Sequence, residues 1–377
     1  MKDKKIAIKG AYGSGNFGDD ALMYVVGCIV KKVAKEKNII FICNRTLPYI
    51  YKMFPSAKFI TRVDRTLSSD VLVYGGGTQF FSFPLTANTN NVHKRIMRNL
   101  NSPFLILKKI FNRIRYKDEI NISKNRMALG VGVGPFVDGS QQKIQAHHLF
   151  SKLNYISVRD DSSLEYCKNW DFNSSLLRSD LCFMTEYFYP MLNEKTISKD
   201  IVSDIGIVVR DWSHTDEGAQ YIERLPELSN KLREHGFKVT FVSFQTLGDK
   251  NVIEKLKDLN ENILEWDVQT DSLSSFVNKL NSFDAFYSAR YHGAIFSAIL
   301  GKPVICVEVE QKLKLVSDLL GEGSRTWSHP FDVDNAINQL NDLTKDLSKP
   351  RKALSEAVSG QEILAHKMIK EFIKECS

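Results

Sequence analysis

The sequence predicts an α/β protein with two Rossmann-like domains, each a parallel sheet with helices on both faces, facing one another across a cleft. Three observations support this. Short apolar strands alternate with amphipathic helices along the whole chain. The 377 residues exceed what one hydrophobic core usually supports. The alternating pattern stops at a polar stretch, Asn193–Asp204, and then restarts.

These observations divide the chain into a first domain (1–192), a linker (193–204), a second domain (205–348) and a final helix (349–377) that we expect to pack back on the first domain. In the first domain, short β-branched or aliphatic runs predict strands at Lys5–Lys9, Ile39–Cys43, Val71–Tyr74, Met127–Val133 and Tyr155–Val158. Apolar residues at helical spacing predict helices at Asp19–Lys35, Gln141–Leu153 and Ser162–Asn169.

The second domain repeats the pattern. Apolar runs predict strands at Ile205–Val209, Lys238–Phe244, Ala285–Tyr287 and Val304–Val307. Helical spacing predicts helices at Glu217–His235, Asn251–Asn260, Ser272–Leu280, Gly293–Leu300 and, at the end of the chain, Pro350–Lys374.

Composition excludes several classes of protein. With 43% hydrophobic and 25% charged residues the chain is typical of globular domains. No apolar run approaches the ~20 residues of a membrane-spanning helix, and Gly10 follows the first apolar residues too closely for a signal peptide. Six scattered cysteines without CxxC spacing favour reduced, buried thiols over disulfides or zinc ligands. We therefore expect a cytoplasmic protein.

The formal net charge of +7 is concentrated in one segment, because residues 94–126 contain ten basic and two acidic residues. This segment lies in an expected basic insertion, about 84–126, in which Phe104–Arg115 mixes large apolar residues with cations. Such a mixture is typical of peripheral contact with anionic lipid, here at the inner face of the plasma membrane. A solvated basic helix packed on its own domain explains the pattern equally well, and we expect no nucleic-acid partner.

Gly10–Ala21 follows the first strand, opens a helix and contains a G-x-G-x-x-G pattern at Gly13, Gly15 and Gly18. Three interpretations stay open: a tight turn with a helix cap, a loop that binds an acceptor substrate, and a dinucleotide loop. Carboxylates at the helix start would compete with a pyrophosphate for the free N–H groups, which disfavours the third. The acceptor interpretation assigns contacts to Gly15, Asn16, Asp19 and Asp20.

Two more glycine loops, Gly75–Gly77 and Gly130–Pro135, close neighbouring strands of the same predicted sheet. Adjacent glycines suit close approach of the backbone to a ligand. Since the carboxyl ends of parallel strands meet at one edge, we expect one crevice with contacts from Gly76, Gly77 and Gly134. Arg159 follows a fourth strand; it is either a fork for carboxylate or phosphate or half of a surface ion pair with Asp160.

The segment Ser288–Ala294 joins a strand to a helix and contains Arg290 and His292. Strand ends and helix starts favour anionic ligands, and the backbone N–H at Gly293 adds a donor there. A permanently charged guanidinium beside an imidazole that titrates near neutral pH suits acid–base chemistry on an anion. An isolated histidine is otherwise most often a buried structural residue. The other histidines show no metal-ligand spacing, so we expect no metal.

These motifs, in this order, resemble the polysaccharide pyruvyl transferase family. The resemblance covers Gly13-x-Gly15-Asn16-x-Gly18-Asp19-Asp20-Ala21, Gly75–Gly77, Gly130–Pro135, Ser157-x-Arg159-Asp160, Ser179-Asp180, Arg290-x-His292, Gly301-x-Pro303 and Lys312. It implies a two-domain fold like that of GT-B glycosyltransferases, with Arg159, Arg290 and His292 as functional residues. The chain departs from the family pattern at Asp20, Tyr291 and the residues Glu308, Glu310 and Gln311 before Lys312.

The resemblance also implies a reaction, transfer of pyruvate from phosphoenolpyruvate to two hydroxyls of a sugar as a ketal. Phosphoenolpyruvate would be the donor substrate, with no other cofactor. A cell-surface glycan or its lipid-linked precursor would be the acceptor. Arg159 and Arg290 would hold the donor, with a contact from Lys312. His292 would protonate it, and Asp19 or Asp20 would take the acceptor's proton.

Three alternatives stay open. One is a GT-B glycosyltransferase that uses a nucleotide sugar, and another is a non-catalytic module that binds glycan or phosphate. The weakest is an NADP enzyme, which would rest on the Gly13–Gly18 pattern and on Arg45 at the end of the second strand.

Overall fold

The computed structural model describes residues 3–82, 116–193, 201–213 and 215–376. Within these ranges, no helix combines the length and hydropathy needed to span a membrane. Most of the basic insertion, including residues 94–115 of the expected lipid contact, lies outside the described residues, as does the centre of the expected linker, 194–200. Both stay predictions.

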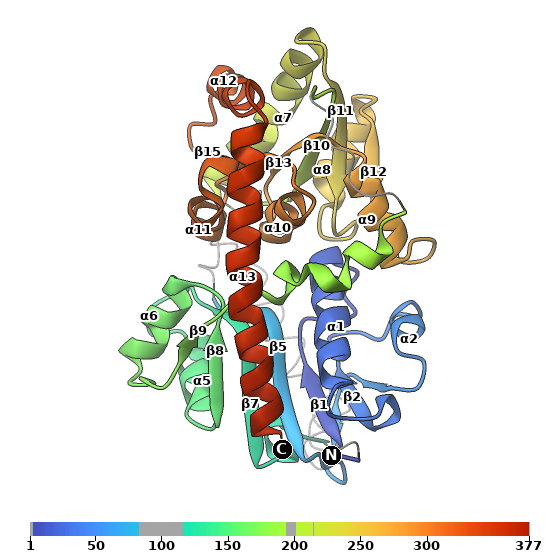
Figure 1. Ribbon diagram of the computed structural model, residues 1–377, viewed down its shortest axis with the longest axis vertical. Helices are drawn as coiled ribbons and strands as arrows, with labels where there is room; N and C mark the ends of the chain where they lie inside the picture. The colour runs from blue at the N-terminus through green and yellow to red at the C-terminus, as the bar shows by residue number, and fades with distance from the viewer. Residues whose placement is uncertain (1–2, 83–115, 194–200, 214, 377) are drawn as a thin grey trace, which may run out of the picture. The chain divides into compact units, whose positions relative to one another are not determined.

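The described residues group by contact into two units (Figure 1). The first comprises those within Met1–Gly13, Val26–Leu177 and Ile369–Ser377, and the second those within Ser14–Val25 and Arg178–Met368. The first turns of α1 (Phe17–Val30) therefore belong to the second unit, and the last residues of α13 (Ser348–Glu375) to the first. There the Tyr155 hydroxyl donates to Glu371 Oε2 at 2.7 Å.

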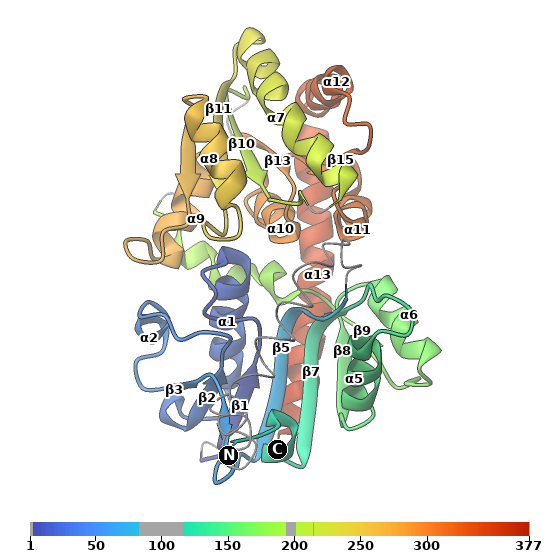
Figure 2. The ribbon, with the colours of Figure 1, turned by 180° about the vertical axis from the view of Figure 1, so that it is seen from behind.

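The first unit is built on a parallel sheet whose seven strands, counted over the described residues, run in the order β3-β2-β1-β5-β7-β8-β9. Their bounds, in that order, are Lys58–Ile60, Ile39–Ile42, Ile6–Lys9, Val71–Phe80, Asn125–Val133, Tyr155–Val158 and Leu176–Leu177. Its other helices are α2 (Ile50–Met53), α5 (Gln141–Phe150) and α6 (Asp161–Asn169). The long β5 and β7 lie side by side in both ribbon views (Figures 1 and 2).

The glycine run Gly75–Gly77 does not end a strand, as we expected, but lies inside β5. Gly76 and Gly77 take φ of 68° and 73°, in the left-handed region that only glycine enters without strain. Pairing with β7 continues past them, and the register shifts between Thr78 and Phe80. The expectation of a strand ending at Tyr74 was therefore wrong, because glycine allowed the ladder to continue through an irregular backbone.

The second unit holds a parallel sheet with six strands among its described residues, in the order β12-β11-β10-β13-β14-β15. Their bounds are Ile263–Glu265, Lys238–Ser243, Asp204–Val209, Ala285–Ser288, Val304–Val307 and Ser324–Trp327. Its helices are α7 (Asp216–Glu234), α8 (Lys250–Asp258), α9 (Leu273–Asn281), α10 (Tyr291–Ile299), α11 (Gln311–Leu320), α12 (Val333–Thr344) and most of α13. The sequence analysis did not predict α11 or α12.

In chain order, the second sheet runs 3-2-1-4-5-6, the doubly wound arrangement of a Rossmann fold, and the first shares it over its first six strands. Strand order reverses between β10 and β13 in the second unit and between β1 and β5 in the first. The predicted α/β class, with two Rossmann-like parallel sheets, is confirmed.

Candidate active site

The carboxyl-terminal edge of the second sheet gathers charged residues on both sides of its switch point. Arg210 follows β10, Arg290 follows β13, and Glu310 and Lys312 lie at the start of α11 after β14. In doubly wound sheets, loops at this position bind the ligand. The candidate site is therefore at the edge where the sequence placed Arg290 and His292.

Arg290 is a rigid residue of this edge. It is the N-cap of α10, and the Ser288 hydroxyl shapes its turn by donating to the Arg290 carbonyl at 2.8 Å. Its Nε donates to the Val209 carbonyl at 3.0 Å, and Nη2 donates to Asp249 Oδ1 at 2.5 Å. Asp249 is fully buried and also accepts from the Ser243 hydroxyl at 2.8 Å. Among the described residues, Nη1 of Arg290 has no partner, so it is the edge still available to a ligand.

Two further cations lie at this edge, and the sequence analysis assigned no role to one of them, Arg210. Its guanidinium stacks on the Trp212 ring, 3.9 Å from the centroid, and pairs with Glu310. Burial lowers the pKa of Arg210; Glu310 opposes this shift and the charge of Arg290 adds to it. Lys312, which the sequence did single out, has its Nζ 2.9 Å from Glu310 Oε1.

The cluster of Arg210, Arg290, Lys312, Asp249 and Glu310 has three cations and two carboxylates. Helices α10 and α11 both begin here, and neither N-cap side chain bonds to its helix. Free N–H groups and an excess of positive charge both stabilise an anion. The cluster can therefore bind a small anionic ligand.

His292 lies in the first turn of α10 with most of its side chain buried. Its Nε2 is 3.6 Å from Asp180 Oδ2, and this nitrogen is buried and makes no hydrogen bond within the described residues. Asp180 is itself fixed, because Oδ1 accepts from the Cys182 backbone N–H at 2.9 Å. Asp180 belongs to the Ser179-Asp180 motif, so the sequence held a signal for it.

Gly18 makes room for the imidazole. A Cβ at this position would lie 2.3 Å from His292 Nδ1. The third glycine of the G-x-G-x-x-G pattern thus leaves space for the His292 side chain. This packing explains why a glycine stands here, and no bound dinucleotide is needed to explain it.

The start of α1 is anchored in the second unit. Asn16 Oδ1 accepts from the Gly18 N–H at 3.0 Å, and the Phe17 ring packs against Phe244, Trp266, Phe276 and Phe296. Asp20 is fully buried, and its Oδ2 accepts from Trp266 Nε1 at 3.0 Å. Asp19 is half-buried, and Gly15 has a φ of 70°. The acceptor contacts proposed for these four residues, Gly15, Asn16, Asp19 and Asp20, stay a prediction.

Asp180, Cys182 and His292 each offer one ligand atom, and these atoms lie within 4.8 Å of one another. Such a set has the residue types of a transition-metal site. The expectation of a metal-free site therefore stays a prediction.

Arg159 belongs to the first unit and is 4% exposed. Its Nη2 donates to the Thr78 hydroxyl at 2.7 Å, and its Nε is 3.3 Å from Asp160 Oδ2. The guanidinium side of the ion pair with Asp160 is thus buried, and the carboxylate side is partly buried. A pocket shared by Arg159 with Arg290 and His292 of the second unit stays a prediction.

One glycine of the first unit, Gly132, lies against Arg159. A Cβ at Gly132 would approach its guanidinium to 3.1 Å, and Gly134, with a φ of 84°, faces the Tyr166 ring. Gly76 and Gly77 lie in β5, whose next residue is Thr78. This edge therefore brings the glycine backbone and a buried guanidinium together.

Comparisons with known proteins agree with this architecture. The sequence profile of the polysaccharide pyruvyl transferase family matches residues 16–311. No curated protein matches the chain. The MnaA–UDP structure from S. aureus is 10% identical with a TM-score of 0.60, covering 99% of this chain and 98% of that one. The UDP-N-acetylglucosamine 2-epimerase of Rickettsia bellii is 12% identical with a TM-score of 0.58, covering 98% and 96%. At such identities the similarity shows the fold alone.

Proposed function

The chain belongs to the polysaccharide pyruvyl transferase family, and from this premise we propose that it moves the pyruvyl group of phosphoenolpyruvate onto two hydroxyls of one sugar. The acceptor is a sugar of a cell-surface polysaccharide or of its lipid-linked precursor. The single observation that carries the proposal is the pairing of His292 with buried Asp180, two residues along the chain from Arg290 of the cation cluster.

The cation cluster suits this donor. Phosphoenolpyruvate carries a carboxylate and a phosphate on three carbons, so its site requires fixed positive charge over a short span. Arg290 offers Nη1 while Asp249 and the Val209 carbonyl hold the rest of its guanidinium. Arg210 and Lys312 both form ion pairs with Glu310, which holds the two cations in place. Both can then contribute positive charge to the binding of the donor anion. Arg159, if it reaches the same ligand, adds a further fork.

In the proposed reaction, the His292 imidazolium gives its proton to the methylene carbon, and the first sugar hydroxyl bonds to the central carbon as it loses its proton. The bond from that carbon to the phosphate oxygen then breaks, and the second hydroxyl closes the ketal. One of the two hydroxyl protons restores the proton that His292 gave to the methyl group. The other leaves with the phosphate. Asp180 lies 3.6 Å from Nε2 and so orients the ring that transfers the proton. Asp19 is the better placed of the two α1 carboxylates for the hydroxyl proton, because Asp20 is fully buried.

The test incubates the protein with phosphoenolpyruvate and a panel of free and lipid-linked glycosides, following phosphate release and the mass of the glycoside. We expect phosphate release matched by the mass gain of one pyruvyl ketal. His292→Gln should retain its fold and lose about 10²–10⁴-fold in kcat. The matched control is His235→Gln, an exposed histidine of the same unit, which should behave as wild type. Full turnover in His292→Gln would refute the assignment, and turnover of a UDP-sugar without phosphoenolpyruvate would establish a glycosyltransferase instead.

Asp180→Asn separates the positioning role from a structural one. The amide keeps the size of the side chain but removes the carboxylate charge that faces Nε2, so kcat should fall while the KM for phosphoenolpyruvate and the melting temperature stay close to wild type. An unchanged kcat would remove Asp180 from the mechanism. Arg290→Lys tests the donor site, since an ammonium cannot bond to Val209, Asp249 and a ligand as the fork does, and its KM for phosphoenolpyruvate should rise.

A further inference from the structure

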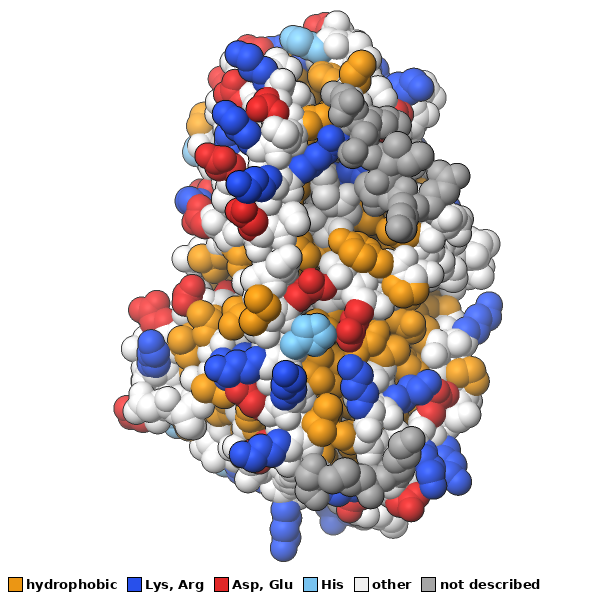
Figure 3. All heavy atoms as spheres, in the orientation of Figure 1, with side chains coloured by type: hydrophobic (Ala, Val, Ile, Leu, Met, Phe, Trp, Pro, Cys, Tyr) orange, Lys and Arg blue, Asp and Glu red, His pale blue; other side chains and the backbone are white. Residues whose placement is uncertain are grey.

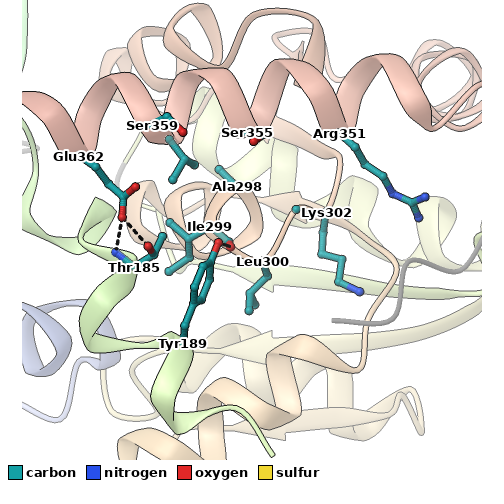
Figure 4. A pocket seen from close by; sticks show the side chains of 12 residues that line it. Thr185, Tyr189, Ala298, Ile299, Leu300, Lys302, Arg351, Ser355, Ser359 and Glu362 are labelled. Atoms are coloured by element: carbon teal, nitrogen blue, oxygen red, sulfur yellow. Dashed lines mark hydrogen bonds between the residues drawn. The ribbon is translucent and has the colours of Figure 1, made fainter. Parts of the chain in front are cut away.

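A pocket with a volume of about 400 Å³ lies in the second unit, at the opposite end of α10 from His292. Its walls come from three segments: residues 185–189, the end of α10 with the turn that follows it, and one face of α13 (Figure 4). The α13 residues of the lining are separated by three or four positions, apart from the neighbours Val358 and Ser359, so one face of the helix lines the pocket; they are Arg351, Ser355, Val358, Ser359 and Glu362.

Hydrogen bonds hold the walls of this pocket in place. Glu362 Oε1 accepts from the Thr185 backbone N–H at 3.1 Å and from its hydroxyl. The Tyr189 hydroxyl donates to the Ile299 carbonyl at 2.9 Å, which occupies a carbonyl of the last turn of α10. Gly301, with a φ of 67°, ends that helix and turns the chain into Lys302. The pocket is therefore a built feature rather than a gap between loosely packed helices.

Polar groups of different kinds occupy different parts of the pocket. Lys302 and Arg351 lie together at one end, and Glu362 with Thr185 at the other (Figure 4). Between them, the hydroxyls of Ser355 and Ser359 make no hydrogen bond within the described residues. Lys302 is only 8% exposed, so most of this lining residue is buried.

The remaining lining is apolar, from Ile299, Leu300 and Val358. Such a surface suits the C–H face of a sugar ring, and the free serine hydroxyls suit its hydroxyls. Two cations in the lining of one pocket suit a phosphate. On the face shown in Figure 3, charged side chains of both signs lie on the α12 side of the unit.

We propose that this pocket is a binding site for a hexose monophosphate, with the phosphate on Lys302 and Arg351 and the sugar hydroxyls on Ser355, Ser359 and Glu362. The volume of the pocket is in the range of small-molecule sites. The site shares no lining residue with the anion cluster at the amino end of α10, and the proposal does not depend on the proposed pyruvyl transfer. It also provides a role for Lys302 in the Gly301-x-Pro303 motif.

The test is calorimetric titration of the full chain with glucose 1-phosphate and glucose 6-phosphate, alongside glucose and inorganic phosphate. We expect at least one hexose phosphate to bind at least tenfold more tightly than either fragment. Arg351→Gln should weaken it at least tenfold. The matched control is Lys352→Gln, the next residue of α13, whose side chain is 77% exposed and outside the pocket, and it should bind as wild type.

Ser355→Trp fills the pocket from its exposed edge and should abolish hexose phosphate binding, which separates this site from any other anion site of the chain. Circular dichroism and thermal melting confirm that each variant is folded, and Lys302→Met provides a second charge deletion. Absence of hexose phosphate binding at millimolar concentration would overturn the proposal. So would unchanged binding in Arg351→Gln and Ser355→Trp, or equally tight binding of inorganic phosphate.

Discussion

Gly18→Ala tests whether the position of the His292 ring matters. An alanine Cβ would lie 2.3 Å from Nδ1, 2.6 Å from Cγ and 2.8 Å from Cβ of His292, whereas ordinary contacts begin at 3.4 Å. The ring must therefore retreat by about 1 Å, because the first turn of α1 is anchored by the Phe17 N–H bond to the Phe244 carbonyl at 2.9 Å. A displacement of this size costs about 10²-fold in rate, or about 2.7 kcal/mol.

The fold should tolerate the change. Gly18 is helical, so alanine gains up to about 1 kcal/mol of helix propensity, which offsets part of the ~1–3 kcal/mol cost of overpacking. We expect a loss of no more than about 2 kcal/mol in unfolding free energy, measured in urea, and a hundredfold loss in kcat. Gly360→Ala is the control, because its Cβ would meet nothing within 4 Å. A folded Gly18→Ala protein with wild-type kcat/KM would refute the reasoning.

Three further predictions concern buried groups of the second unit. Asp249→Ala leaves the guanidinium of Arg290 in a buried place without its carboxylate, and urea unfolding should show a loss of about 3–5 kcal/mol; a loss under 1 kcal/mol would contradict the ion pair. Trp266→Phe removes the indole donor to buried Asp20 and should cost about 1–3 kcal/mol by the same measurement, with the aromatic packing retained. Burial raises the pKa of the Cys306 thiol to about 12, so little thiolate exists at pH 8. Iodoacetamide should therefore modify this cysteine only as the pH approaches 12 or when urea unfolds the chain, and rapid labelling of the native protein at pH 8, followed by mass spectrometry, would contradict its burial.

The sequence by itself determined the alternation of strands and helices and the location of Arg290 and His292 at a strand end and helix start. These features depend on local periodicity and on residues close together in the chain. The helices α11 and α12 were not predicted, although both have a buried apolar face. The end of β5 was misplaced because glycine is normally a sign that a strand has ended.

Only the tertiary structure decided what meets His292. Asp180 approaches its Nε2 from a distant segment, and Gly18 makes room for its ring from a helix that begins near the amino terminus. Likewise, Arg210 belongs to the cation cluster because β10 and β13 are neighbouring strands where the strand order reverses, which brings Arg210 and Arg290 to the same edge of the sheet. These contacts join residues far apart in the chain, and strand order and side-chain packing, which no local pattern encodes, bring them together.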